Sequence, residues 1–115
     1  MTIEEKLQLA NTIAQNMLSA TAVVGYGNRR MSIKGVDKNE LSKVQAFLCT
    51  HRDMRLTLQL LRSLIKSPFA LRSRRTEGYY RNALGVIEKH LQNVPTGDAA
   101  EILGWVVRLM GYYQR

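Results

Sequence analysis

The residues best suited to chemistry in this sequence are basic, and most of them gather in one stretch of the chain. Between positions 52 and 81 there are eight basic and two acidic residues, a net charge of +6 out of +8 for the whole chain. The basic residues are Arg52, Arg55, Arg62, Lys66, Arg72, Arg74, Arg75 and Arg81. Arginine presents a planar fork of N–H donors that matches a phosphate group, so this stretch predicts contact with a nucleic-acid backbone.

A second group of cations lies in residues 21–36, TAVVGYGNRRMSIKGV. Arg29, Arg30 and Lys34 occur there without an acidic residue among them. The three glycines of this segment favour turns. The segment is compatible with a short hairpin, with a partly mobile loop, or with a fifth short helix. It could wrap a phosphate backbone or serve as an ordinary solvated connection.

Groups that could catalyse a reaction are few. The two histidines, His51 and His90, have no partnered acid or nucleophile nearby in sequence. Cys49 is the single cysteine, which excludes an internal disulfide, and it is expected to be a small buried hydrophobe. No Walker loop and no pair of carboxylates stands out. We therefore expect no enzyme activity, no metal site and no cofactor.

Residues 38–67 carry the clearest helical pattern and must position much of the basic stretch. Two interleaved sets spaced by seven form an apolar seam: Val44, His51, Leu58 and Ile65, with Phe47, Met54 and Leu61. This unbroken heptad predicts one long helix that ends before Pro68. Arg55, Arg62 and Lys66 recur at helical spacing about 100° from the seam, so they can stay exposed while the seam is buried.

Three further helices are predicted, over residues 3–20, 77–92 and 98–113. Thr2 and Glu5 form a capping-box pattern at the first of them. On the second, Arg81 and Lys89 lie eight residues apart and so point in similar directions. The last is apolar nearly all round and is expected to be the most buried helix. Its polar strip carries Gly104 and Gly111, which would let a neighbouring helix or a second protein approach closely.

The fold class that follows is all-α: a compact bundle of four to five helices, one of them long, in a single domain spanning residues 1–115. The N-terminus does not resemble a signal peptide, and no stretch approaches 18 uninterrupted apolar residues. We therefore expect a cytoplasmic protein that does not cross a membrane.

Tyr79 and Tyr80 lie beside Arg74, Arg75 and Arg81, the one place where base stacking and phosphate contact could coincide. The alternative, which we favour, is that Tyr80 belongs to the core and Tyr79 to its rim. Elsewhere the sequence offers no pattern that reads bases, so the expected binding is independent of sequence. The pattern does not distinguish DNA from RNA.

Two segments, RRTEGYYR at residues 74–81 and EILGWVVRLMGYY at residues 101–113, resemble the C-terminal helices of small subunits of multisubunit CRISPR interference complexes, of type III and type I-D. The resemblance implies a non-catalytic subunit of an antiviral ribonucleoprotein. Its basic face would line the guide–target duplex or the displaced strand. It also implies contacts with other subunits of the complex and head-to-tail self-association.

A different class of function fits the same charges. The chain could be a helical scaffold or interaction protein whose basic surface docks on an acidic protein partner. A ribosome-associated or chromosome-associated basic factor is a third interpretation. The heptad seam does not decide between them, because a bundle within one chain would use it equally well.

Overall fold

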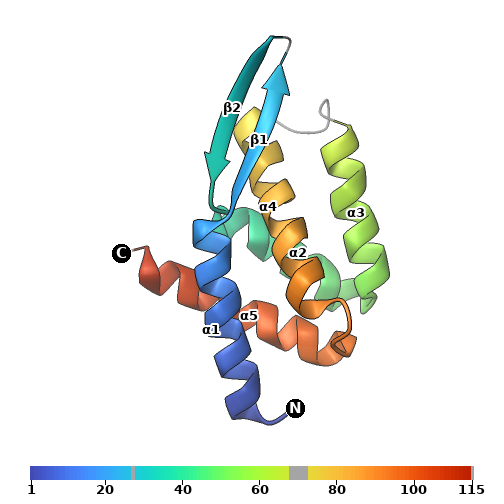
Figure 1. Cartoon of the computed structure of the whole chain (residues 1–115). Helices are drawn as coiled ribbons and strands as arrows, with labels where there is room; N and C mark the ends of the chain where they lie inside the picture. Colours follow the sequence, from blue (N-terminus) through green and yellow to red (C-terminus); the bar gives the residue numbers. More distant parts are fainter. Residues whose placement is uncertain (27, 68–72, 115) are drawn as a thin grey trace.

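The computed structural model describes residues 1–26, 28–67 and 73–114. Its elements are the helices α1 (Ile3–Ser19), α2 (Lys38–His51), α3 (Met54–Lys66), α4 (Arg74–Leu91) and α5 (Thr96–Tyr113), with strands β1 (Thr21–Tyr26) and β2 (Arg29–Lys34) between α1 and α2. Figure 1 shows a helical bundle from which the two strands rise as a hairpin. The predicted compact all-α bundle of four to five helices is confirmed.

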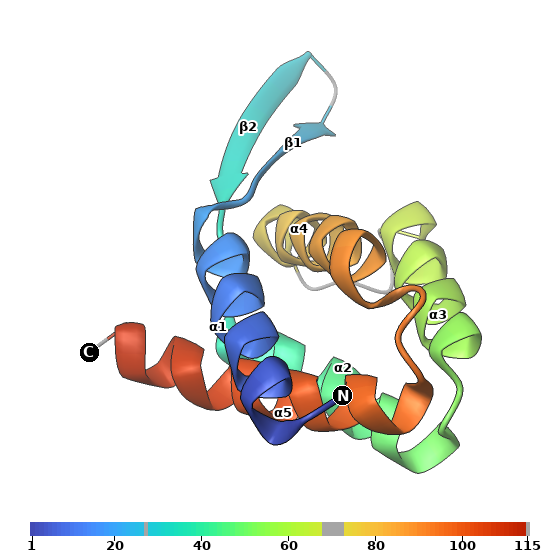
Figure 2. The ribbon, with the colours of Figure 1, turned by 60° about the horizontal axis from the view of Figure 1, so that its bottom comes forward.

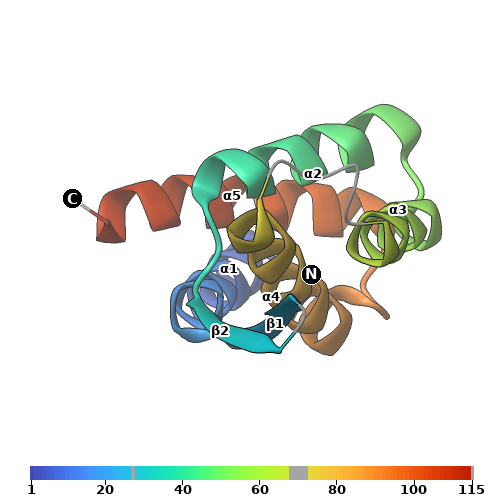
Figure 3. The same cartoon turned by 90° about the horizontal axis from the view of Figure 1, so that it is seen from above.

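The helices form two layers. Seen from above in Figure 3, α2 and α5 run alongside each other in one layer, while α1, α4 and α3 lie in the other. The core fills the space between the layers, where Leu41, Leu61, Ile87 and Leu103 are fully buried. Helices α3 and α4 lie side by side in the layer that also contains α1, and each keeps one face exposed.

The beginning of α1 follows the sequence pattern. The hydroxyl of Thr2 accepts a hydrogen bond from the backbone N–H of Glu5 at 3.1 Å, and the Glu5 carboxylate accepts one from the N–H of Thr2 at 2.9 Å. This reciprocal pair satisfies two N–H groups that a helix otherwise leaves without partners. One turn later, Lys6 contacts Asp98 at 3.1 Å and Glu101 at 2.8 Å, which ties the start of α1 to the start of α5.

The prediction of one long helix over residues 38–67 is wrong, because the chain breaks between α2 and α3. Arg52 adopts the left-handed conformation, with φ 52° and ψ 40°, and its N–H donates to the carbonyl of Leu48 at 2.8 Å. Asp53 then caps α3 by accepting from the N–H of Leu56 at 3.0 Å. An aspartate at an N-cap competes with a continuous helix, and this signal lay hidden inside the heptad. The fifth helix arises from this break and not from residues 20–36.

Residues 21–36 contain a β-hairpin, one of the three structures that the sequence allowed. Its strands are antiparallel, with Ala22 opposite Ile33 and Gly25 opposite Arg30. The hairpin lies over the first half of α4, where Ile33 is buried. Gly35 follows in a left-handed conformation (φ 82°), and its N–H donates to the carbonyl of Ala20 at 2.7 Å.

Two α4 residues hold the hairpin in place. A β-carbon at Gly78 would lie 2.4 Å from the β-carbon of Ile33, so only glycine admits the strand at this distance. One helical turn further on, the amide of the buried Asn82 donates to the carbonyl oxygens of Ile33 at 3.1 Å and of Gly35 at 2.8 Å. The hairpin is therefore anchored near its base by close packing and by two buried hydrogen bonds.

Three smaller expectations need correction. Cys49 is exposed rather than buried, because it faces outward on α2 beside the amide of Gln45. His51 is exposed although it falls in the heptad, because α2 ends at this residue. The helix with the most buried residues is α4 rather than α5, because the hairpin covers α4 and does not cover α5.

The glycine strip of α5 accommodates a neighbouring helix, one of the two predicted occupants. A β-carbon at Gly104 would lie 3.4 Å from the Gln45 amide nitrogen, and one at Gly111 would lie 3.5 Å from the Lys38 amine. Both contacts come from α2. In the described part of the chain, no helix is long and apolar enough to cross a membrane.

Candidate nucleic-acid interface

The structure brings four predicted cations together on the exposed side of α3 and α4. Arg62, Lys66 and Arg81 line one hollow between these helices. Arg55 and Arg62 line a second hollow, which continues along α3 toward the turn that leads into α5. Because Arg62 lines both hollows, the two lie next to each other along α3.

A third hollow extends this surface across α4 toward α1. Arg81 and Gly85 line it as well as the first hollow, and Lys89 lies on its α4 side. Arg81, Gly85 and Lys89 follow one another every fourth residue, which places them in one row along α4. We call the surface formed by Arg55, Arg62, Lys66, Arg81 and Lys89 the cationic face. Lys89 was the one member absent from the set of predicted binding residues.

Carboxylates hold two members of the cationic face in place. Arg62 pairs with Glu88 at 3.3 Å, and Arg81 pairs with Glu77 at 2.9 Å. Both arginines remain more than 40% exposed. Such pairs contribute little stability at a surface but fix the direction of the guanidinium groups. Arg55, Lys66 and Lys89 form no ion pair with the residues that the structure describes.

Gly85 lies in the centre of the cationic face without a structural need for glycine. It is exposed, and no described atom lies within 4 Å of the position that its β-carbon would take. Glycine in the interior of a helix costs about 0.5–1 kcal/mol relative to alanine. Its presence keeps the surface low between Arg81 and Lys89, where an elongated ligand could approach the helix backbone.

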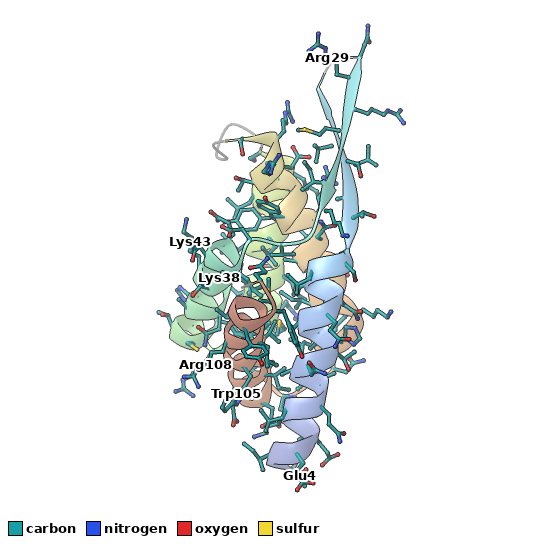
Figure 4. The ribbon with its side chains drawn as sticks, turned by 90° about the vertical axis from the view of Figure 1, so that its left-hand side faces the viewer. Glu4, Arg29, Lys38, Lys43, Trp105 and Arg108 are labelled. Atoms are coloured by element: carbon teal, nitrogen blue, oxygen red, sulfur yellow. The ribbon has the colours of Figure 1, made fainter. Side chains whose placement is uncertain are left out.

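The hairpin cations form a separate group. Figure 4 shows Arg29 at the far end of the ribbon, beyond the helices. Arg30 and Lys34 are also exposed, and none of the three forms an ion pair with a described residue. They are therefore free to contact a ligand, but the structure does not bring them onto the cationic face.

The remaining predicted cations are scattered. Arg74 and Arg75 begin α4, where Arg74 pairs with Glu77 at 3.0 Å and Arg75 is exposed. Arg52 occupies the turn between α2 and α3. Arg72 lies outside the described residues. Of the eleven residues predicted to bind nucleic acid, the cationic face contains four: Arg55, Arg62, Lys66 and Arg81.

The tyrosine pair is structural, as we favoured. Tyr80 is buried, and its hydroxyl donates to the Glu40 carboxylate at 2.6 Å, which links α4 to α2. Burial and the Glu40 carboxylate raise the pKa of Tyr80 well above its ordinary value. Tyr79 packs half-buried at the edge of the core. The buried ring of Tyr80 is therefore not available for base stacking.

His90 joins α4 to α1 beside the cationic face. Its Nε2 lies 2.7 Å from the Asn16 amide nitrogen, and the amide can donate only to a neutral ring. Burial, and then the nearby Lys89, lower the pKa of His90. Both effects favour the neutral form that the hydrogen bond requires.

The stability of the protein should therefore fall as the pH is lowered from 7 to 5. The unfolded chain takes up a proton at His90 near pH 6.5, while the folded chain resists protonation to a lower pH. Thermal unfolding across this range tests the expectation. His90→Gln should flatten the pH dependence. An unchanged pH dependence in His90→Gln would contradict this role.

Another basic hollow, separate from the cationic face, lies between α2 and α5, on the side shown in Figure 4. Lys38, Arg108 and Tyr112 line it. Arg108 lies over the ring of Trp105 at 5.0 Å, a cation–π contact. Lys38 and Arg108 were not among the predicted binding residues, because they lie far apart along the chain. With fewer cations than the cationic face, this hollow is the weaker candidate for a polyanion.

Among the described residues, no three or more histidine, cysteine, aspartate or glutamate side chains gather as metal ligands would. Comparisons with protein-family models, with curated proteins and with solved structures found no significant match.

Proposed function

We propose that this chain is a non-catalytic protein that holds the sugar–phosphate backbone of a nucleic acid on its cationic face. The observation that supports this proposal is a set of three neighbouring hollows along α3 and α4, which cations from both helices line. Three of its five cations have no carboxylate partner among the described residues. Gly85 leaves room for the ligand between them.

The mechanism is electrostatic. Each phosphate that a lysine or arginine neutralises releases condensed counterions, so the logarithm of affinity falls with the logarithm of salt concentration by about 0.7–0.9 per contact. Such contacts fix the position of a strand without reading its bases. The paired arginines need little reordering on binding, because Glu77 and Glu88 already direct their guanidinium groups.

We extend the proposal to the setting in which this activity is used. The resemblance of residues 74–81 and 101–113 to small subunits of CRISPR interference complexes supports a subunit of a cytoplasmic antiviral ribonucleoprotein. In that setting the cationic face would stabilise the guide–target duplex or the displaced strand. Copurification of the tagged chain with a guide RNA and larger subunits from its native cells would support this extension. Recovery of the chain alone would oppose it.

The triple variant Arg55→Glu, Lys66→Glu and Lys89→Glu tests the backbone-binding activity. None of these three cations pairs with a carboxylate of the described residues. Replacing them by glutamate therefore leaves no buried acid without a partner. We expect affinity for labelled DNA and RNA to fall about a hundredfold at low salt, with a salt dependence shallower by about 2 to 3. Fluorescence anisotropy over a salt series measures both quantities.

The matched control reverses three cations elsewhere. Lys38→Glu, Lys43→Glu and Arg108→Glu change the net charge by the same amount on the α2–α5 side of the molecule. Circular dichroism should show wild-type helicity for both variants. Equal loss of affinity in the two would mean that net charge, or the hollow between α2 and α5, drives binding rather than the cationic face. No binding by the wild-type chain at low salt would overturn the proposal and favour an acidic protein partner.

A further inference from the structure

We infer that the β1–β2 hairpin enters a groove of double-stranded DNA, so that the chain prefers a DNA duplex to a single strand or to duplex RNA. This inference rests on the proposed backbone-binding function, because it assigns the form of nucleic acid that the chain holds. It uses cations that lie outside the cationic face, and it can therefore fail separately.

The hairpin presents cations on both of its faces. Adjacent residues of a strand point to opposite sides, so Arg30 and Lys34 share one face, while Arg29 shares the other with Ile33. A ribbon laid on a single strand would use the cations of one face only. A groove of a duplex has a phosphate backbone on each side, which suits a ribbon charged on both faces.

Packing uses only part of the hairpin. Val24 and Ile33 are 2% and 4% exposed where the ribbon lies on α4. On the opposite face Val23 is 61% exposed, and near the far end Met31 is 43% exposed. Val23 and Met31 therefore offer exposed apolar side chains beside the cations, one on each face of the ribbon.

The dimensions of the hairpin favour DNA. Each strand has six residues, which at about 3.4 Å per residue gives a ribbon roughly 20 Å long. The major groove of B-form DNA is about 12 Å wide and admits a two-stranded ribbon. The corresponding groove of duplex RNA is deep and too narrow for side chains to read.

The hairpin and the cationic face meet on α4. The strands pack against the residues around Gly78 and Asn82, and the row formed by Arg81, Gly85 and Lys89 continues along the same helix. Figure 2 shows the ribbon rising from this helical layer. A duplex entered by the ribbon could therefore reach both groups of cations through one rigid element.

The test compares two variants with the same loss of charge. Arg29→Gln with Arg30→Gln changes the hairpin, and Arg55→Gln with Lys66→Gln changes the cationic face. Each is titrated by anisotropy with a labelled DNA duplex, its single strand, and duplex RNA of the same sequence. We expect the hairpin variant to lose about tenfold in affinity for the DNA duplex and less than about twofold for the other probes. The cationic-face variant should lose affinity for all three.

A conservative variant separates charge from structure. The double variant Arg29→Lys with Arg30→Lys should keep most of the wild-type preference for the DNA duplex, since the positive charges remain. Equal losses on all probes, or no loss on the DNA duplex, would overturn the inference. A wild-type preference for single strands would overturn it while leaving the proposed function intact. No binding of any probe by the wild-type chain would overturn both.

Discussion

Gly78→Ala is expected to destabilise the protein by about 1–3 kcal/mol, as small-to-large changes in a packed interior do. The added β-carbon would lie 2.4 Å from the β-carbon of Ile33 and less than 3 Å from two further carbons of that side chain. Both residues are buried, so neither can move into solvent. Urea unfolding should show the loss as a lower midpoint with an unchanged slope.

The same substitution seven residues later is the control. At Gly85 a β-carbon has no described atom within 4 Å, so Gly85→Ala should stabilise the protein by about 0.5–1 kcal/mol through higher helix propensity. The two alanine variants of one helix are therefore expected to differ in sign. A gain of stability in both would show that the hairpin shifts away from Gly78 at little cost.

Asn82→Leu is expected to have a comparable or larger effect. Its amide is a donor to both the Ile33 and the Gly35 carbonyl oxygens, and a buried acceptor without a donor costs about 1–3 kcal/mol. Leucine has the same number and arrangement of side-chain heavy atoms as asparagine, so the loss reports on the hydrogen bonds better than the loss in an alanine variant would. The free energy of unfolding from urea titration measures it.

An exposed asparagine provides the comparison for Asn82. Asn39→Leu on the outside of α2 should change stability by less than about 0.5 kcal/mol, the usual range for surface positions. If Asn82→Leu were equally mild, water would have to satisfy the two carbonyl groups. The anchor of the hairpin would then be its packing on Gly78 alone.

Helix ends show what local sequence could and could not predict. The capping box at Thr2 and Glu5 predicted the start of α1 correctly, because all its partners lie within three residues. The break at Arg52 was missed, although Asp53 is a good N-cap residue. The heptad stayed in phase across the break, so Leu58, Leu61 and Ile65 still reach the core from a separate helix. Periodicity alone does not reveal a turn that preserves it.

The candidate site was predicted in part for a similar reason. Arg55, Arg62 and Lys66 share a face because they lie on one helix, and helical spacing is visible in sequence. Their meeting with Arg81 and Lys89 depends on how α3 packs on α4, which no local pattern gives. Glu88 lies far from Arg62 in sequence, so that pair could not be identified beforehand. Glu77 precedes Arg81 by one helical turn, a spacing that is visible in the sequence.

The left-handed arginine between α2 and α3 has a consequence for sequence variation. Glycine adopts this backbone conformation freely, whereas a side chain costs about 1 kcal/mol there. If the turn alone were under selection, relatives of this chain would carry glycine or asparagine at the position of Arg52. Arginine or lysine kept there across distant relatives would mean that selection maintains a charge against the preference of the backbone.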